Sequence, residues 1–199
     1  ERMKEMKVNV LLYDGFEALD AFGPVEVLGS MEEFELQYVS LEGGMVKSWQ
    51  GFQVDTVAIQ TVSVAEILLV PGARNVRPLL EDAAFMQVLK EAAEASQYCL
   101  TVCTGSALLC KTGLLNGKKA TSNKMAFAWV KTLNDLVDWQ GCARWTKDGK
   151  YYTASGISAG QDMVLGFVAE LFGTERALKE AHAIEYVWNQ SPENDPFAK

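Results

Sequence analysis

The sequence predicts one α/β domain built on a mostly parallel β-sheet with helices on both faces. Short, nearly unbroken apolar runs are typical of strands buried on both sides, and helical patterns separate these runs along the chain. Strands that alternate with helices form right-handed βαβ units, so the strands lie parallel. The chain has 199 residues, of which 49% are hydrophobic, and can therefore bury one sizeable core. We predict a single domain over residues 1–199.

The predicted strands are apolar runs that stop at turn residues or at the start of a helix. The first run ends at Asp14-Gly15, and a later one is stopped by Pro71-Gly72. We expect strands of the parallel sheet at residues 8–13, 34–40, 67–70 and 98–102. An antiparallel hairpin is expected at the sheet edge, where residues 144–145 and 151–153 flank Asp148-Gly149.

The helical patterns lie between these strands and in the last third of the chain. Asp82 is a suitable N-cap for one helix, and Gly113 and Gly173 are suitable terminators for two others. We expect helices at 18–28, 83–95, 104–111, 159–172 and from 174 to about 187. The tail at 190–199 is rich in turn residues and is expected to be ordered at most in part, against a partner.

Charge and composition disfavour several classes of partner. The net charge of −8 leaves no basic face for nucleic acid or an anionic membrane. No apolar run approaches the roughly 20 residues that span a bilayer, and no secretory cleavage pattern follows the first residues. We therefore expect a cytoplasmic protein that acts on a small molecule.

Four cysteines and a single histidine limit the possible metal and disulfide chemistry. The cysteines show no C-x-x-C spacing, and the chain is large enough to fold without disulfides. Reduced thiols are the expectation, with no metal site and no cofactor. Cys99 lies within a predicted strand and Cys110 within a predicted helix, so both are expected to be packing residues.

Cys103 is the candidate nucleophile, because it joins a predicted strand directly to a predicted helix. The sequence Thr101-Val102-Cys103-Thr104-Gly105-Ser106 has the strand–turn–helix order of a nucleophile elbow. A thiol at a helix N-terminus also lies near unpaired amides, which favour the thiolate. The alternative is a buried cysteine that only packs.

A nucleophilic thiol needs a partner that moves protons, and the chain offers a histidine or a carboxylate. His182 is more simply explained as a surface or packing residue of a late helix. Asp20 is the better candidate, because it begins the helix after the first strand and has apolar neighbours that would raise its pKa. Glu17 and Glu26 compete with it, and Asp20 could alternatively serve only the helix dipole.

Backbone amides near the predicted elbow could stabilise a developing negative charge. The amide of Thr104 and those of the Pro71-Gly72-Ala73 turn are expected to converge near the sulfur as an oxyanion hole.

Five ordered segments of the chain resemble the DJ-1/PfpI (ThiJ) superfamily over nearly its whole length, and within it the isocyanide hydratase branch. They are Leu19-Asp20-x-x-Gly23-Pro24-x-Glu26-Val27-Leu28, Val70-Pro71-Gly72, Val102-Cys103-Thr104-Gly105-Ser106, Thr112-Gly113-Leu114-Leu115-x-Gly117-Lys118-x-Ala120-Thr121 and Gly156-Ile157-x-Ala159-Gly160-x-Asp162.

This resemblance implies a fold, an assembly and a set of site residues. The implied fold is a flavodoxin-like three-layer sandwich, similar to class I glutamine amidotransferases, and the implied assembly is a homodimer. It implies a reactive Cys103 paired with a carboxylate at Asp20, and it places Ile157 near the substrate. Other branches carry glutamate at the Asp20 position, so aspartate together with Thr104 points to the hydratases.

Three residues depart from patterns within the superfamily. Thr104 stands where protease-like members have a histidine, which disfavours peptide hydrolysis. Asn123 stands where glyoxalase-like members, and close hydratases as well, carry a histidine. Ala73 replaces a usual glycine and is expected to narrow the pocket or shift the oxyanion hole.

Three functions therefore remain open from the sequence. The first is hydration of an isocyanide to an N-formamide through a Cys103 thioimidate, with Asp20 as general acid and base. The second is a glyoxalase or related carbonyl-processing enzyme. The third is a sensor of oxidation at Cys103, or a transcription regulator, which is disfavoured because no helix-turn-helix pattern is present up to Lys199. Side chains near Ile157, Trp145 and Asn123 are expected to shape the pocket.

Overall fold

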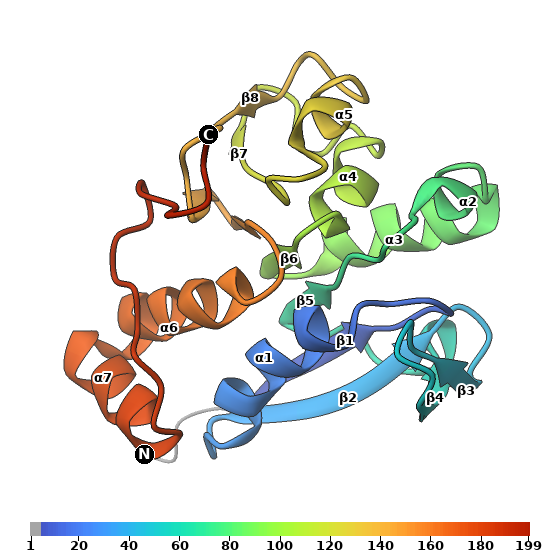
Figure 1. The fold of residues 1–199 in the computed structure, drawn as a ribbon. Helices are drawn as coiled ribbons and strands as arrows, with labels where there is room; N and C mark the ends of the chain where they lie inside the picture. The colour runs from blue at the N-terminus through green and yellow to red at the C-terminus, as the bar shows by residue number, and fades with distance from the viewer. Residues whose placement is uncertain (1–4) are drawn as a thin grey trace.

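The computed structural model describes residues 5–199 and is built on an eight-stranded sheet with the order β3-β4-β2-β1-β5-β6-β10-β9 (Figure 1). The inner strands β4, β2, β1, β5, β6 and β10 run parallel, whereas β3 and β9 pair antiparallel at the two edges. The eight strands are β1 (Met6–Leu11), β2 (Phe34–Ser40), β3 (Gly44–Lys47), β4 (Gln53–Ala58), β5 (Ile67–Val70), β6 (Tyr98–Val102), β9 (Trp145–Asp148) and β10 (Tyr151–Ala154).

Helices cover both faces of this sheet and produce three layers. Helices α1, α6 and α7 pack together on one face, and α3 and α4 lie on the other (Figure 1). The helices are α1 (Ala18–Gly29), α2 (Arg77–Leu80), α3 (Ala83–Ala95), α4 (Gly105–Cys110), α5 (Phe127–Lys131), α6 (Ala159–Phe172) and α7 (Thr174–Ala183), with a short 3-10 turn at Ile59–Thr61. The predicted flavodoxin-like α/β fold is confirmed.

Local sequence signals account for several of these boundaries. The side chain of Asp82 accepts a hydrogen bond from the Phe85 amide at 3.0 Å, as expected of the cap of α3. The predicted hairpin forms from β9 and β10, but only β9 is an edge strand. Strand β10 lies inside the sheet, parallel to β6, which brings its carboxyl end beside Cys103.

The structure adds elements that the sequence did not predict. Strands β3 and β4 form a second hairpin at the opposite edge, and β7 (Lys119–Ala120) pairs with β8 (Asp138–Trp139) in a small separate sheet. Helix α7 ends at Ala183, before the predicted 187, and Glu185 just beyond it has a positive φ of 52° that no regular helix accommodates. Within residues 5–199, no helix combines the length and apolarity needed to cross a membrane.

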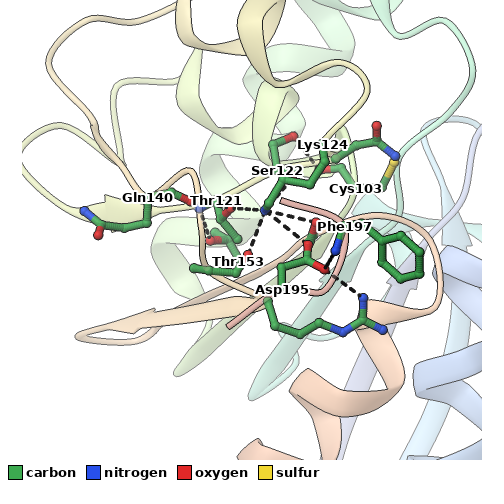
Figure 2. A network of polar contacts seen from close by, with 12 residues as sticks. Cys103, Thr121, Ser122, Lys124, Gln140, Thr153, Asp195 and Phe197 are labelled. Atoms are coloured by element: carbon green, nitrogen blue, oxygen red, sulfur yellow. Dashed lines mark hydrogen bonds and ion pairs between the residues drawn. The ribbon is translucent and has the colours of Figure 1, made fainter. Parts of the chain in front are cut away.

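The C-terminal tail packs against the chain itself. The carbonyl of Pro192 accepts a hydrogen bond from the Arg144 amide at 2.7 Å, and the side chain of Asp195 is buried. Its carboxylate pairs with Lys124 at 3.4 Å and with Arg144 at 3.5 Å. The tail is therefore tied to the turn after β7 and to the residue that precedes β9 (Figure 2).

Candidate active site

The carboxyl ends of three neighbouring parallel strands, β5, β6 and β10, meet around Cys103. Val70 of β5 lies opposite Thr101 of β6, and Ala154 of β10 lies opposite Val102. The residues that follow these strands therefore lie side by side, as ligand-binding residues do in open α/β sheets. A hydrogen bond of 2.9 Å from the Glu17 amide to the Gly72 carbonyl brings the start of α1 to the same place.

Cys103 occupies the sharp turn that the sequence predicts. Its φ is 58°, a left-handed conformation that is rare for a residue other than glycine. The hydroxyls of Ser106 and Ser122 both donate to its carbonyl, at 3.1 and 3.0 Å. A Cβ at Gly105 would collide with the Val70 carbonyl, so only glycine fits after Thr104. The turn is thus held from two sides, in the manner of a nucleophile elbow.

Asp20 lies fully buried beside the sulfur. Its Oδ2 accepts a hydrogen bond from the Gly72 amide at 3.0 Å, and its Oδ1 has no hydrogen-bond partner in the described part of the chain. Burial raises the pKa of the Asp20 carboxyl well above its ordinary value, and the hydrogen bond from the Gly72 amide and the neighbouring Cys103 thiol offset this only in part. An unpaired oxygen on a carboxyl that favours its neutral form is a suitable proton donor.

The same burial changes the ionisation of the Cys103 thiol. Burial is the largest cause that raises its pKa well above the ordinary value, and the negative charge of Asp20 is the second. The amide of Thr104 and the side chains of Asn123 and Thr104 lower this pKa by less. Burial therefore opposes the effect of the helix N-terminus, which was expected to favour the thiolate.

The backbone donors around the sulfur are arranged differently from the predicted oxyanion hole. The Gly72 amide is bonded to Asp20, and the Ala73 amide donates to Thr104 Oγ1 at 3.0 Å. The Thr104 hydroxyl in turn donates to the Ala73 carbonyl at 3.0 Å. Of the three predicted amide donors, that of Thr104 is the one that lowers the pKa of the Cys103 thiol. Gly72 is needed for packing, since a Cβ there would lie 2.6 Å from the Thr104 nitrogen.

Two neighbours of the sulfur were not assigned a role from the sequence. Asn123 was expected only to depart from the family pattern and to shape the pocket; its Oδ1 accepts a hydrogen bond from the Ala126 amide at 3.1 Å, and its Nδ2 lies against Gly156. Tyr13, just beyond β1, donates to the Pro71 carbonyl at 2.6 Å. Burial, and then the charges of Asp20 and Cys103, raise the pKa of Tyr13 well above its ordinary value. Its place after the first strand was the available signal, because strand ends meet at one edge.

The competing carboxylates and the histidine take other positions. Glu17 is buried, but its carboxylate accepts hydrogen bonds from Gln50 at 2.6 Å and Arg74 at 3.3 Å. Glu26 is exposed on α1, and His182 is exposed on α7. Asp20 is therefore the acid that the fold places beside Cys103.

The remaining predicted pocket residues divide into one near the site and one in the core. Ile157 is partly buried and directly follows Gly156, where a Cβ would collide with the Asn123 side chain. Trp145, in contrast, packs its ring against Gly166 of α6, where a Cβ would lie 2.9 Å from the indole. The expectation that Trp145 shapes the pocket is wrong, because β9 directs it onto the helix layer.

The other cysteines behave as structural thiols, and no metal centre accompanies the site. Cys99 and Cys110 are buried, and burial raises the pKa of each to about 12. Cys142 is exposed, and all four thiols are free. Among residues 5–199, no group of three or more His, Cys, Asp or Glu side chains could hold a metal ion.

Comparison with known proteins agrees with this geometry. A model described as the DJ-1/PfpI family matches residues 6–170, and the chain belongs to this family. The chain is 32% identical over 186 residues to the isonitrile hydratase of Pseudomonas putida, which covers 91% of this chain and 78% of that protein. A ThiJ/PfpI family protein from Pseudomonas syringae superposes with a TM-score of 0.81 and 27% identity, covering 98% of this chain and 78% of that one. The oxidized DJ-1 of Toxoplasma gondii, at 23% identity, shares the fold with a TM-score of 0.77 over 92% of this chain and all of its own.

Proposed function

We propose that this protein is a cysteine-dependent enzyme that hydrates an isocyanide to an N-formamide. The observation that carries the proposal is the pairing of Cys103, in a strained elbow, with the fully buried Asp20, whose Oδ1 has no partner among the described residues. The similarity to the isonitrile hydratase of Pseudomonas putida supports this choice of substrate. The proposed reaction requires no cofactor.

The proposed reaction uses one proton that Cys103 and Asp20 exchange. As the sulfur attacks the terminal carbon of R–N≡C, the neutral Asp20 carboxyl delivers its proton to that carbon and takes the thiol proton in its place, giving the thioimidate Cys–S–CH=N–R. Water adds to the same carbon, with Asp20 taking one proton from the water while the nitrogen gains one. The C–S bond then breaks, R–NH–CHO leaves, and the sulfur regains its proton. The net change is addition of one water.

The raised pKa values suit this neutral substrate. A carboxyl can act as a general acid near neutral pH only if it keeps its proton. Burial favours this protonated form at Asp20 by raising its pKa. A mostly protonated thiol can pass its proton to Asp20 only as Asp20 gives its own proton to the substrate, so attack and proton transfer are coupled at one place.

The test uses p-nitrophenyl isocyanide as substrate and follows the corresponding formamide. We expect turnover by the unaltered protein, and its loss by a factor of at least about 100 in Cys103→Ala and Asp20→Asn, in line with the contribution of a positioned acid or base. Full activity in either variant would contradict the mechanism. Lactate formed from methylglyoxal, with the isocyanide inert, would instead indicate a carbonyl-processing enzyme.

A further inference from the structure

We propose that a cavity between α3 and the sheet is a second binding site, which takes a small neutral molecule with an apolar body and a carboxamide group. Asn9 of β1 is the residue that recognises the carboxamide. The cavity shares no lining residue with the site around Cys103. This inference therefore does not depend on the proposed function.

Asn9 is the one polar residue among the four buried residues of β1, at positions 8–11. Side chains alternate along a strand, so Asn9 points away from its two neighbours and, with its register partner Leu68 of β5, toward the cavity. It is only 5% exposed, yet its side-chain amide forms no hydrogen bond in the described part of the chain. A buried amide without a partner is costly, which points to a ligand that pairs with it.

The cavity lies between α3 and the segment at residues 59–65 and has a volume of about 330 Å³. Its walls are mostly apolar, and Ile59, Leu68 and Val88 among them are at most 8% exposed. Small-molecule sites have this size and this composition, with a few polar groups in an apolar setting. Water alone would satisfy Asn9 but would leave these walls wet, whereas a ligand with an apolar body and an amide removes both costs.

The class of ligand follows from the groups that the cavity presents. The Asn9 amide offers both a donor and an acceptor, and a carboxamide offers both in return. Glu91 is the only charged residue that lines the cavity, and it is exposed and accepts a hydrogen bond from Gln87 at 2.7 Å. Because no cation lines the cavity, a carboxylate ligand would lose its hydration and gain no charged partner. The ligand is therefore neutral.

The experiment compares two probes of nearly the same shape, benzamide and acetophenone, by titration followed with protein NMR. Acetophenone has a methyl group in place of the amide NH₂, so it cannot donate to Asn9. We expect benzamide to bind with a Kd of about 5 mM or below, and acetophenone to bind about tenfold more weakly. Equal affinities for the two probes, or no binding of benzamide, would overturn the proposal.

Asn9→Leu tests the recognition residue, because it keeps the branched shape and removes the amide. The preference for benzamide over acetophenone should disappear in this variant. Its Tm should stay the same or rise, since the substitution removes an unpaired polar group from apolar surroundings. A lower Tm with the preference unchanged would show that Asn9 serves folding alone, which contradicts the inference.

Ala92→Leu tests the cavity without changing Asn9. Ala92 lines the cavity from α3 and is partly buried, so a larger side chain there should fill the space and abolish binding of both probes. Ala84→Leu, on the exposed face of the same helix, is the matched control and should bind both probes as the unaltered protein does. Binding that survives Ala92→Leu in folded protein would place the probes elsewhere and overturn the assignment of this cavity.

Discussion

The carboxyl of Asp20 determines much of the behaviour of this site at the residue scale. A buried acid with an unpaired oxygen is costly to ionise, so folding favours the neutral form. The sequence indicated this environment through the apolar residues around Asp20. It could not indicate that the Gly72 amide would bond to Asp20 instead of to substrate, because that depends on how α1 approaches the turn after β5.

The raised pKa of Asp20 predicts a stability that falls as pH rises. Its folded pKa lies above its unfolded value near 3.9, so the stabilising difference is complete below about pH 3.9 and is lost as pH rises toward the folded pKa. Asp20→Asn keeps an oxygen for the Gly72 amide but cannot ionise. As pH rises through that window, we expect the free energy of unfolding of Asp20→Asn to increase relative to that of the unaltered protein, by up to about 1.4 kcal/mol per pH unit.

Urea unfolding of both proteins between pH 4 and 8 measures this difference. Glu26→Gln on the exposed face of the same helix is the control and should run parallel to the unaltered protein. A constant difference between Asp20→Asn and the unaltered protein over this range would show that Asp20 ionises as an ordinary carboxyl does.

At the scale of elements, long apolar strands and capped helices were predictable and short edge elements were not. Strands β5 and β6 and helices α3 and α6 have the predicted bounds, because each has a continuous pattern and a clear stop signal. Strands β7 and β8 have two residues each, β3 is a four-residue edge strand and half of the residues of β4 are polar, so none of these strands has a long apolar run.

The motif segment from Gly156 to Asp162 is explained by packing between elements. A Cβ at Gly160 would lie 2.8 Å from Val102 and 3.2 Å from Pro24, so this glycine lets α6 approach both β6, which ends at Val102, and α1. Asp162 accepts hydrogen bonds at 2.9 Å from Arg144 Nε, the Tyr186 hydroxyl and the Asn189 amide. It thereby joins α6 to β9 and to the segment after α7.

Removing the charge of Asp162 is expected to be costly. Asp162 and Arg144 are both buried, and Asp162→Asn leaves the guanidinium with only the longer contacts to Asp195 and to the Ser158 hydroxyl. Breaking a buried pair in this way costs about 3–5 kcal/mol of stability. The matched control is Glu170→Gln, whose partner Lys147 is 43% exposed and whose loss should cost less than about 1 kcal/mol. Chemical denaturation compares them, and equal costs would show that burial does not strengthen the Asp162 pair.

At the scale of the whole molecule, the homodimer that the family resemblance implies stays a prediction. The structure offers one exposed apolar surface beside the site, formed around the start of α1 and the loop between β3 and β4. Leu19, Trp49 and Phe52 are 41%, 59% and 39% exposed, and Phe52 stacks on Phe22 of α1. Adjacent exposed apolar side chains of this kind mark interaction surfaces, and a two-fold assembly would bury such a surface on both copies.

We therefore expect light scattering to give twice the chain mass of 21.9 kDa, and Trp49→Lys to shift the protein toward the monomer. A lysine at the centre of an apolar contact would be buried in the dimer without a charged partner. The free-energy cost of that burial is larger than the small effect of the same lysine on the exposed surface of the monomer. Val187→Lys, at a valine 92% exposed after α7, is the control and should keep the dimer mass. A dimer that survives Trp49→Lys places the contact on another face, and a monomeric unaltered protein contradicts the assembly. Because Leu19 neighbours Asp20 in sequence, dissociation that also lowers turnover would show that the second copy supports the geometry of the acid.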